Sequence, residues 1–217
     1  KYKVFYVGHP LFDVLKDFQT NNSKRKKIIA LLPGSRDQEI SKILPVMLTV
    51  TKYFRNYKFI ICAAPSKTKS FYKKFINKNY CENIDIVENQ TYNVLHKSSA
   101  ALVASGTATL EAALIKTPQI VCYKSSWISI QIGKFLLRNL KFISLVNLIL
   151  NKAAVKELIQ DDLNTKNIKK ELEIILFGDG KERVLDYYNE LERLLDKKGA
   201  SRETAEKIVN YHLPSNS

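Results

Sequence analysis

Short apolar runs alternate with helix-like stretches through the first half of the chain. The apolar runs lie at residues 28–32, 59–63, 100–104 and 119–123, and each is rich in small or branched side chains; a short strand is also expected at 85–88. Continuous apolar runs of this length are typical of strands buried on both faces. Strands that alternate with helices fold into a parallel sheet with helices on both sides. A further strand is expected at residues 3–7, and the helices after the first two apolar runs are expected over about 37–55 and, as a basic helix, 66–78. The sequence therefore predicts an α/β, Rossmann-like, doubly wound domain.

The pattern changes after residue 123, where helices replace the alternation. An amphipathic helix is expected over residues 127–140, followed by an apolar connecting stretch at 142–150 that contains Asn147. Further helices are expected at about 165–177, 181–197 and 201–212. We therefore predict a Rossmann-like domain over residues 1–163 and a helical tail over 164–217. The chain does not begin with Met, so we expect it to be a piece of a longer protein.

The chain is strongly basic, with a formal net charge of +14 over its 217 residues. Such a charge favours nucleic acid or an anionic membrane as a partner. The lysines are spread over many predicted helices, so a nucleic-acid-binding module ranks last. The densest basic run, Lys24-Arg25-Lys26-Lys27, is expected to be a solvated loop.

The predicted helix at 127–140 has two readings of equal weight. Lys134, Arg138 and Lys141 recur at helical spacing beside an apolar face that includes Trp127. Such a helix could lie on an anionic membrane surface. It could equally be a core helix with a solvated basic face.

The sequence contains no motif that indicates a metal site or a reactive cysteine pair. The three cysteines are widely spaced and form no CxxC pair. The three histidines form no pair with metal-ligand spacing. We expect no metal and no cofactor. No uncharged apolar run of about 18 residues is present, so no spanning helix is predicted.

Two glycine-containing loops follow predicted strands. Ser105-Gly106-Thr107 ends the run at 100–104 and opens a helix, and Pro33-Gly34-Ser35-Arg36 ends the run at 28–32. A helix N-terminus has unpaired N–H groups and the positive end of the helix dipole, so it favours phosphate. An ordinary strand-to-helix turn is the alternative. Neither loop matches a P-loop or a dinucleotide-binding motif.

Two side chains near these loops, Arg36 and Glu111, are candidates for ligand contacts. A cation in the first helical turn opposes the dipole, so Arg36 suits a diphosphate clamp better than helix stability. Ser35 and Gln38 could instead form a capping box. Glu111 lies one turn after Thr107 and could accept hydrogen bonds from ribose hydroxyls, or it could simply complement the dipole.

Four motifs in this order and spacing carry a resemblance to a known family. They are Val7-Gly8-His9-Pro10-Leu11, Leu32-Pro33-Gly34-Ser35-Arg36, Ala104-Ser105-Gly106-Thr107-Ala108-Thr109-Leu110-Glu111 and Ile143-Ser144-Leu145-Val146-Asn147-Leu148. Together they resemble the C-terminal half of the lipid-A-disaccharide synthase family. The resemblance runs from residue 4 to about 165 and more weakly through the tail.

The resemblance implies a GT-B fold and an inverting glycosyl transfer without a metal. In this family a 2,3-diacylglucosamine unit passes from its UDP carrier to 2,3-diacylglucosamine 1-phosphate (lipid X), which forms the lipid A disaccharide 1-phosphate. The resemblance also implies a cytoplasmic protein, peripheral on the inner membrane of Gram-negative bacteria. A homodimer that exchanges its tails is a further implication.

The resemblance also implies roles for individual residues. Gly34, Ser35 and Arg36 would lie at the phosphates, with Arg36 stabilising the leaving UDP. Ser105, Gly106 and Thr107 would bind the diphosphate, Glu111 the ribose, and Asn147 would lie near the nucleotide. The family usually has Pro where this chain has Val146.

The family's candidate general base, an Asp, belongs to an N-terminal half that this sequence does not contain. The fragment alone is therefore expected to be inactive. Another UDP-sugar transferase or epimerase of the same architecture remains the alternative, and only lipid A disaccharide formation needs acyl chains on the donor.

Overall fold

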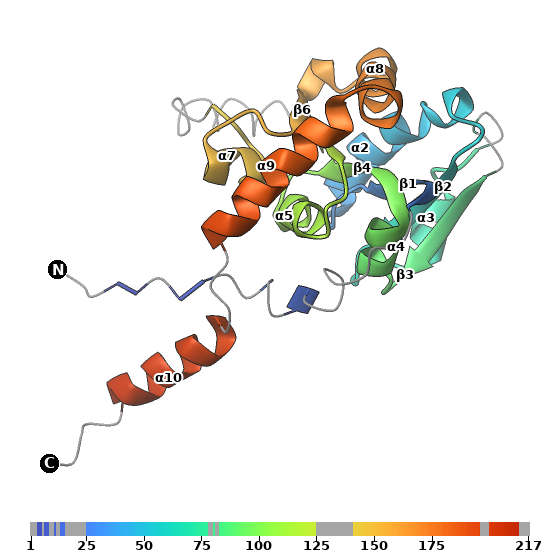
Figure 1. Cartoon of the computed structure of the whole chain (residues 1–217). Helices are drawn as coiled ribbons and strands as arrows, with labels where there is room; N and C mark the ends of the chain where they lie inside the picture. Colours follow the sequence, from blue (N-terminus) through green and yellow to red (C-terminus); the bar gives the residue numbers. More distant parts are fainter. Residues whose placement is uncertain are drawn as a thin grey trace, which may run out of the picture.

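A computed structural model describes residues 4–5, 7–8, 11, 14–15, 25–77, 80, 83–124, 141–195 and 200–212. Its centre is a six-stranded parallel sheet with the strand order β3-β2-β1-β4-β5-β6 (Figure 1). The order reverses between β1 and β4, which confirms the predicted doubly wound α/β fold. The strands are β1 (Lys26–Leu32), β2 (Lys58–Ala63), β3 (Ile84–Glu88), β4 (Ser98–Ala104), β5 (Gln119–Tyr123) and β6 (Lys156–Ile159).

Helices cover both faces of this sheet, and alternate strand residues feed two hydrophobic cores. In β1, Ile29 and Leu31 face one core, whereas Ala30 and Leu32 face the other. The first core is covered by α2 (Asp37–Leu48), α3 (Lys69–Lys73) and α8 (Thr165–Phe177). The second is covered by α4 (Thr91–Lys97), α5 (Thr107–Leu114), α7 (Leu145–Leu150) and α9 (Gly180–Leu195).

The first two tail helices complete these cores, one on each face. Leu172 of α8 and Tyr188 of α9 are fully buried. The last helix, α10 (Ala200–His212), lies apart from the sheet on the side of the N-terminal residues (Figure 1). There the Lys207 ammonium lies 4.3 Å from the centroid of the Phe5 ring. The boundary between residues 163 and 164 stays a prediction.

The helix predicted for residues 37–55 is shorter than expected. It ends at Leu48, and a short 3₁₀ helix, η1 (Thr51–Tyr53), follows. The Thr49 hydroxyl donates to the Val46 carbonyl, and the Thr51 hydroxyl donates to the Leu48 carbonyl. These side chains satisfy carbonyls of the last turn, so the helix can end there.

Other predicted elements also change in length or kind. The predicted basic helix at 66–78 contains only the five-residue α3, whose neighbouring lysines repel one another. The predicted connecting stretch contains α7, because the Ser144 side chain caps it by accepting the Asn147 amide. No strand is predicted at residues 155–160, but the structure has the strand β6 there, which pairs with β5, and the 3₁₀ helix η2 (Gln160–Asp162) follows it.

Two predictions concern poorly covered parts of the chain. The basic helix at 127–140, with Trp127, Lys134 and Arg138, lies outside the described residues. A strand was predicted at residues 3–7. The described residues of this range, which are 4, 5 and 7, form no strand. Val4 is 89% exposed, so it has no sheet face to pack against.

The solvated loop predicted for the basic run is wrong for Arg25. Its guanidinium is largely buried and makes six hydrogen bonds of 2.8 to 3.3 Å. Burial lowers the pKa of Arg25 from its ordinary value. The acceptors are the Thr117 hydroxyl and the carbonyls of Leu95, His96, Ser98, Ile115 and Lys116. Arg25 therefore caps the C-terminal ends of α4 and α5 together.

Candidate functional site

Two loops meet where the strand order of the sheet reverses. β1 ends at Leu32, which pairs with Val103 near the end of β4. The loops that follow, at residues 33–36 and 105–106, therefore leave the same edge of the sheet side by side. Doubly wound sheets bind their ligands at this point.

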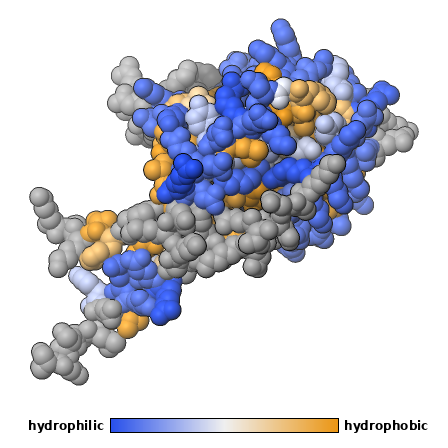
Figure 2. All heavy atoms as spheres, in the orientation of Figure 1, coloured by the Kyte–Doolittle hydropathy of each residue, from blue (hydrophilic) through white to orange (hydrophobic). Residues whose placement is uncertain are grey.

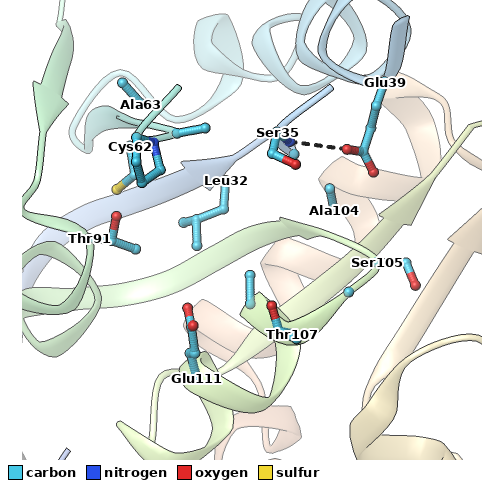
Figure 3. A pocket seen from close by; sticks show the side chains of 15 residues that line it. Leu32, Ser35, Glu39, Cys62, Ala63, Thr91, Ala104, Ser105, Thr107 and Glu111 are labelled. Atoms are coloured by element: carbon cyan, nitrogen blue, oxygen red, sulfur yellow. Dashed lines mark hydrogen bonds between the residues drawn. The ribbon is translucent and has the colours of Figure 1, made fainter. Parts of the chain in front are cut away.

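A cavity of about 250 Å³ opens between these loops (Figure 3). In Figure 3, Thr107 and Glu111 of α5 lie across the cavity from Ser35 and Glu39. Six of the eight predicted site residues line it, namely Gly34, Ser35, Ser105, Gly106, Thr107 and Glu111. The rest of the wall comes from Leu32, Glu39, Cys62, Ala63, Ala64, Pro65, Thr91, Ala104 and Ala108.

Both loop glycines are required by the backbone. Gly34 has a φ of +102°, and a Cβ there would overlap the Glu39 carboxylate. That carboxylate accepts the Ser35 N–H at 3.1 Å. Gly106 has a φ of +153°, but a Cβ there would meet nothing within 4 Å. Both glycines are therefore needed for their backbone conformation, and a side chain at position 34 would also displace the Glu39 carboxylate from Ser35.

The first turn of α5 offers the hydrogen-bond donors of the cavity. The Ser105 N–H donates to the Cys122 carbonyl at 3.1 Å, and its hydroxyl donates to the Ile143 carbonyl at 3.0 Å. Both donors of Ser105 are therefore used inside the protein. Among the described residues, the N–H groups of Gly106, Thr107 and Ala108 have no acceptor, nor has the Thr107 hydroxyl. These donors lie at the positive end of the helix dipole, where an anion is favoured.

Glu111 faces the same cavity from one turn further along α5. The Tyr92 hydroxyl donates to Glu111 Oε1 at 3.3 Å. Burial raises the pKa of the Glu111 carboxyl, and the Tyr92 bond opposes this rise. The other carboxylate oxygen has no partner within the described part of the chain. Glu111 can therefore accept a hydrogen bond from a ligand hydroxyl.

Arg36 follows the lining residue Ser35 but does not line the cavity itself. It is the N-cap of α2, with an extended backbone and an exposed side chain. No side chain caps α2, so the capping box of Ser35 and Gln38 is not formed. The guanidinium has no hydrogen bond or ion pair with any described residue. The neighbouring Asp37 is paired with Lys67, which lowers the pKa of that carboxyl.

Asn147 lies away from this cavity. It is 1% exposed and lines a second hollow, of about 520 Å³, beside the edge strand β6. Its side-chain amide donates to the Val155 carbonyl and to Glu157, and it accepts the Val155 N–H. The structure thus brings six predicted residues together, leaves Arg36 beside them and separates Asn147 from them. The roles of all eight residues stay predictions.

The structure adds Glu39, Tyr92, Thr91 and Cys62 to the candidate site. Glu39 lies one helical turn after Ser35, a spacing that the sequence shows but that also fits an ordinary surface helix. Cys62 is a buried free cysteine. Burial raises the pKa of its thiol to about 12, so Cys62 forms a neutral part of the wall.

The face of the molecule seen in Figure 2 is mostly polar where it is coloured. Within the described ranges, no helix combines the length and the apolar character needed to cross a bilayer. In the same ranges, no three His, Cys, Asp or Glu side chains are grouped so that they could hold a metal ion.

Sequence comparison points to one family. A model described as lipid-A-disaccharide synthetase matches residues 1–210. A lipid-A-disaccharide synthase from a Sulfurihydrogenibium species is 33% identical over 92% of this chain and 61% of its own length. The enzyme of the same name from Francisella tularensis subsp. novicida is 34% identical over 89% of this chain and 54% of its own. The chain thus spans little more than half the length of these relatives.

Solved structures of low sequence identity share the fold. A Listeria monocytogenes protein described as a UDP-N-acetylglucosamine 2-epimerase has a TM-score of 0.61 and 15% identity, over 94% of this chain and 52% of its own. The glycosyltransferase SnogD from Streptomyces nogalater has a TM-score of 0.54 and 16% identity, over 89% of this chain and 45% of its own. The sheet is therefore of the GT-B type, and the chain belongs to the lipid-A-disaccharide synthase family.

Proposed function

We propose that this chain is the UDP-sugar-binding half of an inverting glycosyltransferase of lipid A biosynthesis. The reaction would transfer 2,3-diacylglucosamine from UDP-2,3-diacylglucosamine to 2,3-diacylglucosamine 1-phosphate and release UDP. The observation that carries the proposal is the set of unused donors at Gly106, Thr107 and Ala108, with Glu111 one helical turn beyond. The identity of the two substrates is inferred from the family to which the chain belongs.

The diphosphate would lie at the N-terminus of α5. The three free amides and the Thr107 hydroxyl would donate to its oxygens, while Ser105 would hold the loop from behind. Arg36 would turn its unpaired guanidinium onto the diphosphate, because a planar fork suits phosphate oxygens. Charge that develops on the leaving UDP would then meet fixed donors and a cation, which lowers the barrier to its departure.

The ribose would lie against Glu111. Tyr92 occupies one carboxylate oxygen, so the other would accept a ribose hydroxyl. The ionised carboxylate is the better acceptor for two hydrogen bonds, and burial raises the pKa of this carboxyl, so the strength of the ribose contact would depend on pH.

The remaining parts of the reaction would be supplied from outside this chain. The general base that activates the acceptor hydroxyl would belong to the N-terminal half, which would also hold much of the acyl-chain site. The complete enzyme would work on the cytoplasmic side of the inner membrane, bound peripherally to its anionic surface, and it could be a homodimer. No cofactor is required by this scheme.

The central test is a calorimetric titration of the chain with UDP. Arg36→Ala should weaken UDP binding by about tenfold or more, since a charge-assisted bidentate contact is worth about 1.5–3 kcal/mol. Arg55→Ala is the matched control, because Arg55 is also exposed but precedes β2 at the opposite edge of the sheet. Its UDP affinity should stay within about twofold of the parent's. Absence of UDP binding, or equal effects of both variants, would overturn the proposal.

A second measurement separates this reaction from that of another UDP-sugar enzyme. With the N-terminal half present, transfer should be measured from UDP-2,3-diacylglucosamine and from UDP-N-acetylglucosamine. Only the acylated donor should give the disaccharide. Equal use of both donors, or epimerisation of the unacylated one, would favour the alternative enzyme class.

A further inference from the structure

The side-chain carboxylate of Glu157 accepts an unusually large number of hydrogen bonds for a residue on a strand. It lies on the edge strand β6, opposite Val121 of β5. Its carboxylate accepts the Ile143 N–H at 3.0 Å, the Ser144 N–H at 2.9 Å and the Ser144 hydroxyl at 2.7 Å. It also accepts the Asn147 side-chain amide at 2.9 Å. Four donors from one short segment therefore converge on one half-buried carboxylate.

Asn147 fastens the other end of that segment. Its amide nitrogen donates to the Val155 carbonyl at 2.9 Å as well as to Glu157, and its amide oxygen accepts the Val155 N–H at 2.9 Å. Both amide hydrogens are therefore used, and the side chain is almost fully buried. Asn147 has no donor left for a nucleotide in this arrangement, so its effect on the site must be indirect.

One peptide group joins this network to the candidate phosphate loop. The Ile143 carbonyl and the Ser144 N–H belong to the same peptide unit. Its N–H donates to Glu157, and its carbonyl accepts the Ser105 hydroxyl at 3.0 Å. A carboxylate on the N–H side polarises the peptide and strengthens the bond on the carbonyl side. Glu157 thus holds Ser105 through a single peptide plane.

We propose that Glu157 is a positioning residue for the nucleotide site. Through Ser144 and Ile143 it orients Ser105, and so it aims the free amides of Gly106 and Thr107 into the cavity. Asn147 belongs to the same network and acts through it. The inference rests on the proposed function, because it assigns Glu157 to the diphosphate end of that site.

The test compares Glu157→Gln with Glu171→Gln. A glutamine at 157 places an NH₂ group where a carboxylate oxygen accepts an N–H. The side chain keeps nearly the same shape, but it can no longer accept all four hydrogen bonds. Glu171 is the control, because it lies on α8 near the same edge of the sheet and has no partner among the described residues. Without ligand, the amide NMR signals of Gly106 and Thr107 should shift in Glu157→Gln and stay unchanged in Glu171→Gln.

The same variants then separate a local role from a general loss of structure. Glu157→Gln should weaken UDP binding five- to tenfold and leave the weak binding of uridine, which lacks the diphosphate, unchanged. Ser105→Ala removes the other end of the link and should give the same loss. The double variant should lose no more than either single variant, because both break one chain of contacts. Ser105→Ala alone tests the link if Glu157→Gln does not fold.

The outcomes for the two proposals are distinct. If Glu157→Gln or Ser105→Ala binds UDP as tightly as Glu171→Gln while Arg36→Ala binds it weakly, the inference is overturned and the proposed function stands. An equal loss of UDP and uridine binding also overturns the inference. If the parent chain does not bind UDP, the proposed function fails and takes the inference with it.

Discussion

The two ends of α5 differ in how their terminal backbone groups are hydrogen-bonded. At its C-terminal end, the carbonyls of Ile115 and Lys116 accept hydrogen bonds from Arg25. At its N-terminal end, the amides of Gly106, Thr107 and Ala108 have no acceptor in the described part of the chain. One end of the helix carries its own counter-charge, and the other end lacks one.

The difference follows from what the fold needs and what a ligand can supply. The C-terminal ends of α4 and α5 both contact Arg25 in a partly buried part of the protein, where carbonyls without donors would be destabilising. A protein cation must satisfy them permanently. The N-terminal amides border an open cavity, so water can satisfy them until an anion binds. An end that the protein satisfies with its own side chain serves stability, and an end left to solvent is available for binding.

The largest effect should come from removing the built-in cation. Arg25→Ala would remove one donor from each of five backbone carbonyls and from the Thr117 hydroxyl, so the free energy of unfolding should fall by about 3 kcal/mol or more. Urea denaturation followed by circular dichroism measures this loss. Arg55→Ala, at an exposed site, should change stability by less than about 0.5 kcal/mol. Equal midpoints for the two variants would mean that Arg25 does not support the fold.

A smaller effect is expected at the open end. Gly106→Ala places a side chain on a backbone with a φ of +153°, so it should lower the free energy of unfolding by about 1–2 kcal/mol through strain alone. Relaxation of that strain would turn the α5 amides away from the diphosphate, and UDP affinity should fall about tenfold. Binding and unfolding are measured on the same sample. A variant that loses stability but keeps full UDP affinity would show that these amides do not bind the diphosphate.

The smallest effect concerns pH and Glu111. Its pKa is raised in the folded chain, so folded Glu111 keeps a proton that the unfolded chain releases. Its contribution to stability is therefore present at low pH and is lost as pH rises from the usual glutamate range through the raised pKa. Glu111→Gln removes this loss of stability. Its free energy of unfolding should therefore equal that of the parent at pH 4 and exceed it at pH 7 by less than about 1 kcal/mol.

The control for this prediction is Glu171→Gln, which should show no such difference between the two pH values. The gain in stability should accompany a loss of UDP affinity, because the variant cannot offer a carboxylate to the ribose. Lower stability of Glu111→Gln at pH 7 would contradict the idea that burial of its charge opposes folding.

The N-terminal end of α5 was predicted well from the sequence, and its C-terminal end, which Arg25 caps, was predicted poorly. Gly106, Thr107 and Glu111 are neighbours in the chain, so a strand, a glycine and a helix start can be recognised together. Arg25 bonds to the Thr117 hydroxyl, 92 residues away, and no local pattern reports such a partner. A buried cation in a lysine-rich run has the same local appearance as a solvated one. The predicted solvated loop was wrong for this reason.

The same limit applies to the loop before α7. Asn147 was placed near the nucleotide through the family resemblance, yet its contacts are Val155 and Glu157, eight and ten residues further along the chain. Those contacts depend on β6, a strand that was not predicted from the sequence. Because the strand was missed, the carboxylate that organises the loop was missed with it.

The burial of α8 and α9 has a consequence for how the protein is made. Leu172 closes one core and Tyr188 the other, although β1 to β5 leave the ribosome long before these residues do. During synthesis, each core of the nascent sheet therefore stays incomplete until residues 165–195 have emerged. The candidate site thus belongs to a domain whose sheet is made well before the two helices that complete its cores.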